Sequence, residues 1–311
     1  MIVVFGAINI DLILQVKHFP TPGETVLTPS YEWLPGGKGM NQAIAAVRAG
    51  AKVAMVGRVG DDGFGTRAQN IMRREGILVS GVIQSEEAPT GCATVVIDAS
   101  GENQIIVAAG ANAEVSAAQV PDDILGPGNV VLMQQELDEE TNWQVLERAS
   151  KLGATTILNL APARSLPRQV LEHLDYLIVN RIEAEQIARK LGLKIESDAL
   201  KLAHVLSKDT GLACIITLSG MGSVAVQGDK GWRVPALGVE NVVDRTGAGD
   251  AYCGVFAAGI KQKLSIPDAM RRASVAGSLS TRGRGAQTAM PYIDEIAAFL
   301  PELPEAEAVS L

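Results

Sequence analysis

The sequence has few aromatic residues, a shortage of basic residues and no long apolar run. Aromatics make up 4% of the 311 residues, and 27 Lys and Arg stand against 35 Asp and Glu, which gives a formal net charge of −8. A chain this acidic has no basic stripe to neutralise nucleic-acid phosphates, so we expect no nucleic-acid partner. No apolar run approaches the roughly 18 residues of a membrane span, and no basic segment precedes the apolar residues 2–5. We therefore expect neither a membrane helix nor a secretion signal.

The residues needed for several common chemistries are also missing. The cysteines form no CxxC pair and the histidines show no metal-ligand spacing; these residues are Cys92, Cys214, Cys253, His18, His173 and His204. We interpret the cysteines as reduced, buried thiols of a cytoplasmic protein. No Ser-His-Asp or Cys-His set is apparent. No GxGxxG follows the first apolar run, which disfavours a nicotinamide-dependent dehydrogenase.

From residue 130 onward, apolar runs alternate with helical stretches. The runs are 130–133, 155–158, 176–179 and 214–217. This alternation predicts an α/β fold with a central, mostly parallel sheet and helices on both faces. The same core is expected to include a strand over 2–6, a helix over 40–47, a strand over 53–57 and a helix over 65–75. The acidic tail from Leu303 is expected to be frayed.

Two segments interrupt this core. Residues 10–35 continue an alternating polar and apolar stretch, and residues 90–108 hold two apolar runs around a turn-rich segment, 98–103. We expect 10–35 to form an antiparallel excursion that pairs with 90–108 in a small β-sheet lid. The core domain then comprises residues 1–9, 36–89 and 109–311.

A glycine-rich turn with a carboxylate at each end lies at Asp244–Asp250. In Gly247-Ala248-Gly249 the backbone N–H groups can converge at the start of a helix, which is a common way to hold an anion. Asp250 falls in the first turn of that helix and would repel a bound phosphate. It makes sense as a base that takes a proton from the group attacking the phosphate. The alternative is an ordinary turn with Asp250 as a helix-start charge.

A second glycine-rich segment, residues 36–41, precedes the helix expected over 40–47. Its glycines permit close backbone approach, Lys38 supplies a cation and Asn41 offers an amide, but the P-loop spacing is absent. Upstream, Asn9 and Asp11 lie on one face of a strand and suit vicinal hydroxyls, unless they mark a solvated strand edge.

Polar residues stand at the ends of four predicted parallel strands. They are Glu136, Asn159, Asn180, and Thr217 with Ser219. Ligands bind beyond the carboxyl ends of such strands, so we expect the active cleft there. Asn180 and Glu183 suit Mg²⁺ held largely through waters, and they suit a helix capping box equally well. Both interpretations can hold together.

These motifs resemble those of a known family. GGKGMNQA at 36–43 and DRTGAGD at 244–250 resemble the two signatures of the ribokinase-like carbohydrate kinases, and NRIE at 180–183 is similar to their third motif. The order and separation of the motifs also match, over nearly the whole chain. The resemblance implies transfer of the ATP γ-phosphoryl group to a primary hydroxyl of a pentose, with D-ribose as the expected acceptor. It also implies a β lid that doubles as a homodimer contact.

The resemblance assigns roles residue by residue. Asp250 is the general base, and the N–H groups of Gly247, Ala248 and Gly249 form the anion hole. The sugar site comprises Asn9, Asp11, Gly37, Lys38, Asn41, Glu136 and Asp250. ATP is expected along Asn180, Thr217, Ser219, Gly220, Gly222 and Gly249. Mg²⁺ is expected near Glu183 through water, and a monovalent cation such as K⁺ near Asp244 and Thr246.

Some positions depart from the family pattern. Arg245 stands where a Thr or small residue is usual, and it can touch phosphate or point to solvent. Ser219 replaces a glycine, and changes at 281–284 and at Ala289 border the potassium site. The alternatives to a ribose kinase are a kinase for deoxyribose or a ketose, and a non-catalytic sugar-binding relative.

Overall fold

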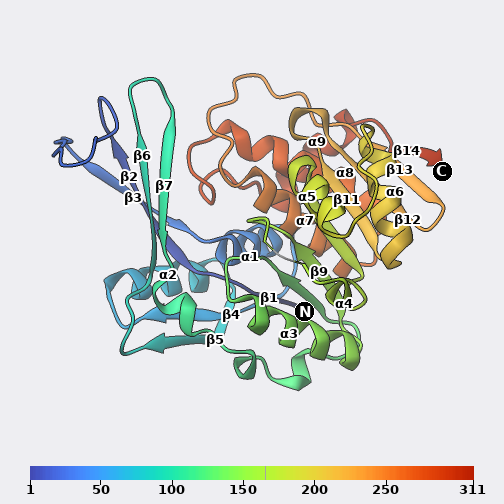
Figure 1. Cartoon of the computed structure of the whole chain (residues 1–311), viewed down its shortest axis with the longest axis horizontal. Helices are drawn as coiled ribbons and strands as arrows, with labels where there is room; N and C mark the ends of the chain where they lie inside the picture. Colours follow the sequence, from blue (N-terminus) through green and yellow to red (C-terminus); the bar gives the residue numbers. More distant parts are fainter. Residues whose placement is uncertain (165) are drawn as a thin grey trace.

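The computed structural model describes residues 1–164 and 166–311, which contain two β-sheets and a set of covering helices (Figure 1). The larger sheet has ten strands. In spatial order they are β14 (Glu307–Ser310), β13 (Lys230–Val234), β12 (Ser223–Gln227), β11 (Ala213–Thr217), β10 (Tyr176–Asn180), β9 (Thr155–Asn159), β8 (Val130–Met133), β1 (Ile2–Phe5), β4 (Val53–Gly60) and β5 (Leu78–Ser85). The strands from β11 to β5 are parallel, and β12, β13 and β14 join by antiparallel pairing.

Helices cover both faces of this sheet because its strands are apolar on both sides. Val3 and Phe5 point to one face of β1, while Ile2 and Val4 point to the other, and all four are fully buried. The first face carries α3 (Glu139–Leu152), α4 (Arg168–Leu171), α5 (Arg181–Lys190) and α6 (Ala199–Thr210). The second carries α1 (Lys38–Arg48), α2 (Gly63–Arg74), α7 (Ala248–Lys261), α8 (Ile266–Leu279) and α9 (Ile293–Phe299). The predicted α/β fold is confirmed.

The smaller sheet stands apart from the helical layers (Figure 1). Its order is β3 (Tyr31–Gly36), β2 (Asn9–Gln15), β6 (Gly91–Ile97) and β7 (Asn103–Ala108). The predicted small sheet is therefore present, and we call these four strands the lid. Antiparallel pairing joins β2 to β3 and β6 to β7, but β2 and β6 run parallel, so the two excursions do not form one antiparallel unit.

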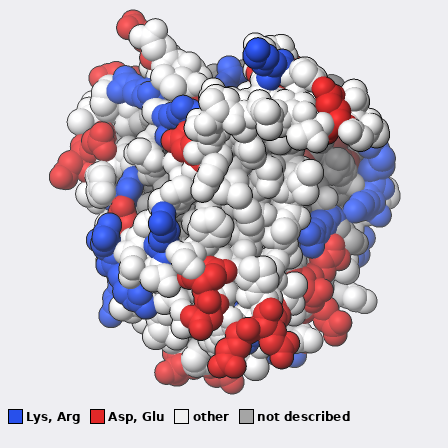
Figure 2. All heavy atoms as spheres, turned by 90° about the vertical axis from the view of Figure 1, so that its left-hand side faces the viewer, with Lys and Arg blue, Asp and Glu red and all other residues white. Residues whose placement is uncertain are grey.

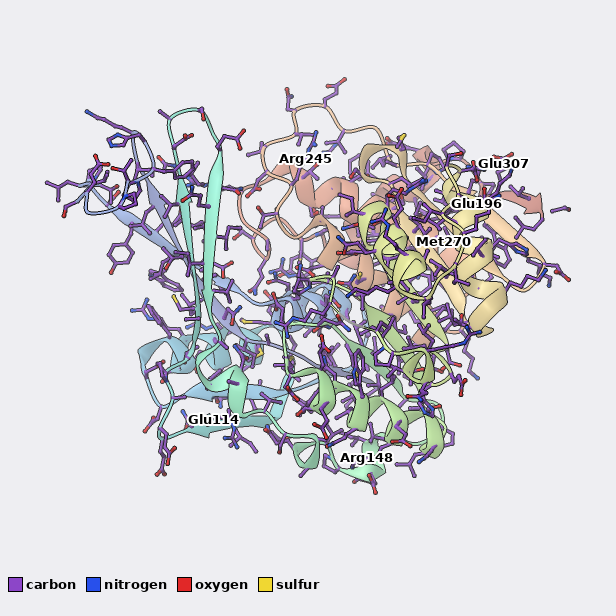
Figure 3. All side chains as sticks on the ribbon, in the orientation of Figure 1. Glu114, Arg148, Glu196, Arg245, Met270 and Glu307 are labelled. Atoms are coloured by element: carbon purple, nitrogen blue, oxygen red, sulfur yellow. The ribbon has the colours of Figure 1, made fainter. Side chains whose placement is uncertain are left out.

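The C-terminal tail is ordered, which corrects the expectation of a frayed end. Residues Glu307–Ser310 form β14 and pair antiparallel with β13, with Glu307 opposite Arg233. The reason is that β13 would otherwise present an edge of unpaired N–H and C=O groups, which a further strand can satisfy. Glu307 marks this strand at the far end of the molecule from the lid (Figure 3).

The helices of the described residues are short relative to a bilayer. None of them is long and apolar enough to span a membrane.

Candidate active site

The carboxyl ends of the parallel strands gather polar side chains at one edge of the sheet, as predicted. Asn159 ends β9, Asn180 ends β10 and Thr217 ends β11, while Glu136 follows β8. These ends meet the start of α7, because Gln42 donates hydrogen bonds from Nε2 to both Asn159 Oδ1 (3.0 Å) and Asp250 Oδ1 (2.9 Å). The strand ends and the glycine-rich turn therefore form a single site.

The start of α7 has the geometry of an anion site. Gly247 is the N-cap with φ of 78°, and a Cβ there would lie 2.6 Å from the Cβ of Ala286, so only glycine fits. The first N–H groups of a helix lack intrahelical partners and attract negative charge. Of the three predicted donors, the N–H of Ala248 already donates to Arg245 O at 3.2 Å. The N–H groups of Gly247 and Gly249 have no such acceptor among the described residues.

Asp250 lies in the first turn of α7 and is buried, with both carboxylate oxygens engaged. Asn41 Nδ2 donates to Asp250 Oδ2 at 3.0 Å, and Gln42 Nε2 donates to Asp250 Oδ1. Both donors come from the first turns of α1, which packs against α7. Gly254 permits this close packing, because a Cβ at Gly254 would lie 2.4 Å from Gln42 O. The two glycine-rich segments are thus in direct contact through Asn41 and Asp250.

Two further amide side chains, Gln134 and Gln287, donate to the amides that contact Asp250. Gln134 Nε2 donates to Gln42 Oε1 at 2.9 Å, and Gln287 Nε2 donates to Asn41 Oδ1 at 2.8 Å. All four amide side chains are buried. Gln134 Oε1 and Gln287 Oε1 are buried without a hydrogen-bond partner in the described part of the chain, at a cost of about 1–3 kcal/mol each.

Sequence reasoning missed Gln42, Gln134 and Gln287 as members of the site. Their partners are 92 to 246 residues away in the chain, so no local spacing reveals them. One available signal was Gln42 itself, a polar residue in the small, apolar stretch that follows Asn41.

The sugar-site residues predicted near the N-terminus also come together. Gly37 has φ of 85°, and a Cβ there would lie 2.7 Å from Ala7 O and 2.8 Å from Asn9 N. This contact seats the start of α1 on the link between β1 and β2. The backbone N–H of Lys38 then donates to Glu136 Oε2 at 2.7 Å. Asn9 Oδ1 accepts from Asn112 Nδ2 at 2.8 Å, so Asn112, which the sequence did not single out, fixes the orientation of Asn9.

The charges of this cluster perturb one another. The negative charge of Asp250, followed by that of Glu136, raises the pKa of Lys38. Burial raises the pKa of Glu136 to about 7, opposed by the charge of Lys38. Burial, with the charge of Asp250 second, raises the pKa of Asp11 to about 6. Carboxyl groups that titrate near neutrality beside a buried ammonium are typical of functional sites.

A pocket of about 520 Å³ opens next to Asp250. Its lining includes the six residues predicted to contact ATP: Asn180, Thr217, Ser219, Gly220, Gly222 and Gly249. Ala248 and Arg245 also line it, and Arg245 is the one charged residue that the described part of the chain contributes to the lining. Figure 3 shows Arg245 on the loop that precedes α7. A Cβ at Gly249 would meet no protein atom within 4 Å, so its backbone faces open space.

The remaining predicted positions take part in backbone capping. Asn180 and Glu183 form a capping box at the start of α5: Glu183 N donates to Asn180 Oδ1 at 2.9 Å, and Asn180 N donates to Glu183 Oε2 at 2.8 Å. The capping interpretation is therefore correct, and Glu183 Oε1 has no hydrogen bond in the described structure. Burial raises the pKa of Glu183. Asp244 accepts from Thr246 N and Gly285 N, each at 2.9 Å, which ties its loop to residues 281–285.

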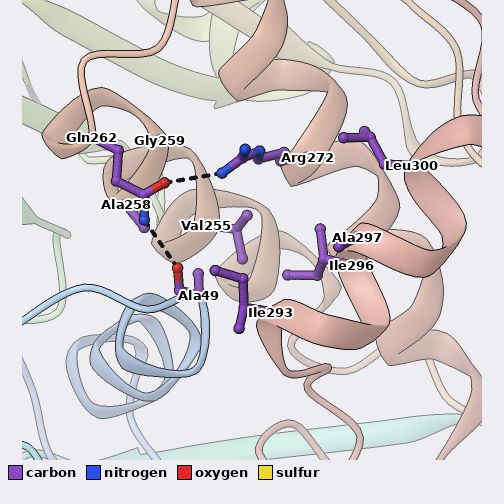
Figure 4. Close-up of a pocket in the computed structure, with 10 residues that line it drawn as sticks. All are labelled: Ala49, Val255, Ala258, Gly259, Gln262, Arg272, Ile293, Ile296, Ala297 and Leu300. Carbon is purple, nitrogen blue, oxygen red and sulfur yellow. Dashed lines mark hydrogen bonds between the residues drawn. The ribbon is translucent and has the colours of Figure 1, made fainter.

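A second hollow lies between α1, α7, α8 and α9, and it lacks this chemistry (Figure 4). It measures about 170 Å³ and its lining is mainly apolar. Its two polar side chains bond to each other and to the backbone: Arg272 Nη1 donates to Gln262 Oε1 at 2.9 Å, and Gln262 Nε2 donates to Ala49 O at 3.2 Å. Among the described residues, no Asp, Glu, His or Cys side chain lines this hollow, so its lining offers no general base.

Known proteins share this architecture. The family description "pfkB family carbohydrate kinase" matches residues 1–293. A ribokinase of Bacillus subtilis (strain 168) is 36% identical over 297 residues, covering 95% of this chain and 97% of its own. A deoxyribokinase of Salmonella typhi is 32% identical over 308 residues, covering 96% and 98%. The chain also resembles the solved ribokinase of Thermotoga maritima (TM-score 0.89, 30% identity, 96% and 99% covered). It is similar to Arabidopsis thaliana ribokinase complexed with ribose and ATP (TM-score 0.88, 28% identity, 96% and 98% covered). These matches extend over nearly the full length of each protein, and this chain belongs to the pfkB family of carbohydrate kinases.

Proposed function

We propose that this sugar kinase transfers the γ-phosphoryl group of ATP to the primary hydroxyl of D-ribose, giving D-ribose 5-phosphate. The observation that carries the proposal is the buried Asp250 carboxylate at the N-terminus of α7. It lies between the predicted sugar-site residues, such as Asn41, and the 520 Å³ pocket. The ribokinase relatives, and the Arabidopsis relative with ribose and ATP, support this choice of substrates.

In this proposal the sugar is held by polar groups from three elements. Asn9 and Asp11 come from β2, Gly37, Lys38 and Asn41 from the start of α1, and Glu136 from the end of β8. Ionised Asp11 and Glu136 accept hydrogen bonds from sugar hydroxyls, while Lys38 and Asn41 donate them. Such a set suits a polyhydroxylated ring, because carboxylates and amides complement hydroxyl groups.

Asp250 takes the proton of the primary hydroxyl as its oxygen attacks the γ-phosphorus. The new O–P bond forms while the bond from the γ-phosphorus to the β–γ bridging oxygen breaks, and ADP leaves with that oxygen. Negative charge on the transferring group faces the N–H groups of Gly247 and Gly249, with the N–H of Ala248 shared with Arg245 O. Catalysis of this kind rests on positioning and charge stabilisation.

We assign the nucleotide to the pocket lined by Asn180, Thr217, Ser219, Gly220 and Gly222. Among the described residues, no three or more His, Cys, Asp or Glu side chains group to hold a metal ion. Glu183 nevertheless fits a water-held Mg²⁺, because its Oε1 is left over by the capping box and its side chain is buried beside Lys38. Bound Mg²⁺ would neutralise phosphate charge there.

A monovalent cation such as K⁺ is assigned beside Asp244 and Thr246. The carboxylate oxygens of Asp244 keep free lone pairs after accepting the N–H groups of Thr246 and Gly285. A cation held there would stiffen the loop before α7. Melting temperatures in KCl and in choline chloride test this: a higher value in KCl that is lost in Asp244→Asn supports the site, and equal values refute it.

A panel of sugars tests the substrate assignment. Steady-state kinetics with D-ribose, 2-deoxyribose and ketoses should give the highest kcat/KM for D-ribose. The deoxyribokinase relative makes 2-deoxyribose the leading alternative. Activity on another sugar with none on ribose would exclude ribose as the substrate, and ribose binding without turnover would indicate a non-catalytic relative.

We further propose a homodimer through the lid. The strand β7 is exposed along its whole length, and Ile106 and Tyr31 are 72% and 66% exposed. Figure 2, which views this end of the molecule, shows a broad uncharged centre bordered by charged side chains. Exposed apolar side chains such as Ile105, Ile106 and Val107 on one strand are typical of an interface. Ile106→Glu should shift the protein from dimer to monomer in analytical ultracentrifugation, whereas Leu152→Glu on α3 should not; a wild-type monomer would refute the dimer.

A further inference from the structure

Two chains of amide side chains converge on the Asp250 carboxylate. One runs from Gln134 through Gln42 to Oδ1, and the other runs from Gln287 through Asn41 to Oδ2. In each chain both amides donate an N–H toward Asp250, and the inner amide accepts with its carbonyl oxygen from the outer one. The two chains therefore share one polarity.

The carboxylate imposes this polarity. An ionised carboxylate can only accept, so Gln42 and Asn41 must turn their NH₂ groups toward it. The next amides must then turn their own NH₂ groups inward, which leaves Gln134 Oε1 and Gln287 Oε1 without partners at the outer ends. Buried polar atoms are seldom left unpaired in proteins. The two unpaired carbonyl oxygens, one at the outer end of each amide chain, indicate that the amides are oriented to donate hydrogen bonds to the Asp250 carboxylate.

Gln42 is the member of the network best suited to orient Asp250. It is fully buried, so it cannot contact a sugar in the way that Asn41 can. Its second N–H is held by Asn159 Oδ1, and Asn159 Nδ2 is anchored on Ile178 O at 3.2 Å. The amide plane of Gln42 is therefore fixed by the central sheet, and it fixes the Oδ1 side of Asp250 in turn.

We propose that Gln42 is a positioning residue for phosphoryl transfer, which orients the Asp250 carboxylate through the Nε2–Oδ1 hydrogen bond. The inference rests on the proposed role of Asp250 as general base, and it assigns a function to a residue that touches neither substrate. Removing the donor lets the carboxylate rotate and weakens its ionised form, because a hydrogen bond donated to a carboxylate favours the charged state.

Other charged and titratable groups also face Asp250, and the test has to allow for them. They are Lys38 from α1, Asp11 from β2, Glu136 after β8 and Cys253 on α7. Gln42→Met and the control Gln69→Met both keep all four of these side chains. A shift of the acid limb of the pH profile that follows only the change at Gln42 can therefore be attributed to its hydrogen bond.

The test compares Gln42→Met, Gln42→Glu and the control Gln69→Met, which alters a buried glutamine on α2 away from the site. Gln42→Met should lower kcat 10- to 100-fold with KM for the sugar changed less than threefold, and should move the acid limb of the kcat/KM profile up by about one pH unit. Gln42→Glu should retain activity at low pH, where the protonated carboxyl donates to Asp250, and lose it as pH rises. Gln69→Met should resemble the wild type.

The outcomes separate this inference from the function on which it rests. Wild-type kcat and pH profile in Gln42→Met would overturn the role of Gln42 while leaving the kinase assignment intact. If the wild type phosphorylates no sugar, the proposed function fails, and Gln42 is judged by ¹³C NMR titration of the Asp250 carboxyl. An unchanged titration in Gln42→Met then refutes the inference. If Gln42→Met does not fold, the variants Gln42→Glu and Gln134→Met test the inference instead. Gln134→Met removes the side chain that donates to Gln42, and it should lower kcat by less than Gln42→Met would. A wild-type pH profile in both variants refutes the role of Gln42.

Discussion

The backbone N–H of Lys38 donates to Glu136 Oε2 over 2.7 Å, and this bond holds a carboxyl group whose pKa burial has raised to about 7. Sugar hydroxyls bond best to an ionised carboxylate, so affinity for ribose should fall as pH drops below 7. With a pKa of about 7, only about a tenth of Glu136 is ionised at pH 6, which predicts roughly tenfold weaker binding at pH 6 than at pH 8. Isothermal titration calorimetry across this range measures it. Glu136→Gln should bind ribose more weakly at every pH and keep only the smaller pH dependence that is due to Asp11. If the affinity of this variant for ribose still changed tenfold between pH 6 and pH 8, Glu136 would not be the titrating group.

Because its pKa is raised, ionised Glu136 lowers the free energy of unfolding of the ligand-free protein at high pH. The folded-state pKa lies above the model value of 4.5. This group's contribution to stability is therefore complete below about pH 4.5 and is lost as pH rises through 7. Glu136→Gln should raise the free energy of unfolding at pH 8 by about 1–3 kcal/mol, with little effect at pH 4.5. Urea unfolding of the wild type and of Glu136→Gln at pH 4.5 and pH 8 measures this difference. An equal gain in stability at both pH values would show that it does not come from the titration of Glu136.

Gly249 should be needed for the ligand and not for the fold. Space for a methyl group exists at Gly249, and Ala is favoured over Gly in a helix by up to about 1 kcal/mol, so Gly249→Ala should be as stable as the wild type or more so. The methyl group would occupy the space where the phosphates are proposed to lie. We expect kcat/KM for ATP to fall at least tenfold. Gly63→Ala is the matched control, since Gly63 also begins a helix and also faces open space; equal activity in the two variants would argue against phosphate binding at Gly249.

The sequence was sufficient for the features that depend on local pattern. Apolar runs define the parallel strands, and the glycines at 37 and 247 are required by backbone contacts that glycine alone permits, so both motifs could be recognised. The Gln42 and Gln287 contacts could not be predicted, because they join α1 to α7 and to a segment 246 residues from Asn41. The strand β14 was missed for a similar reason: its composition is that of a tail, and its order comes from the edge of β13.

Arg245 should strengthen nucleotide binding. Among the described residues, Arg245 is the one charged side chain that lines the 520 Å³ pocket, and its guanidinium has no ion-pair partner there. A charge-assisted hydrogen bond contributes about 1.5–3 kcal/mol, so Arg245→Ala should raise KM for ATP by about tenfold or more with KM for ribose unchanged. Arg245→Lys should recover part of the loss. The control is Arg74→Ala, an exposed arginine on α2. If KM for ATP does not move, Arg245 points to solvent.

Asp250→Asn should separate catalysis from stability. The variant cannot accept the hydroxyl proton, so kcat should fall by about 10²–10⁴-fold while ribose still binds. The new amide fits the network, because Asn41 and Gln287 can turn their amides over. Asn41 then accepts from the new Nδ2 and donates to Gln287 Oε1, which has no partner among the described residues of the native protein. Turnover and melting temperature together test this. We expect Asp250→Asn to melt close to the wild type and Asp250→Ala to melt lower, because Ala leaves the donors of both Asn41 and Gln42 unpaired. Substantial turnover by Asp250→Asn would rule out Asp250 as the base.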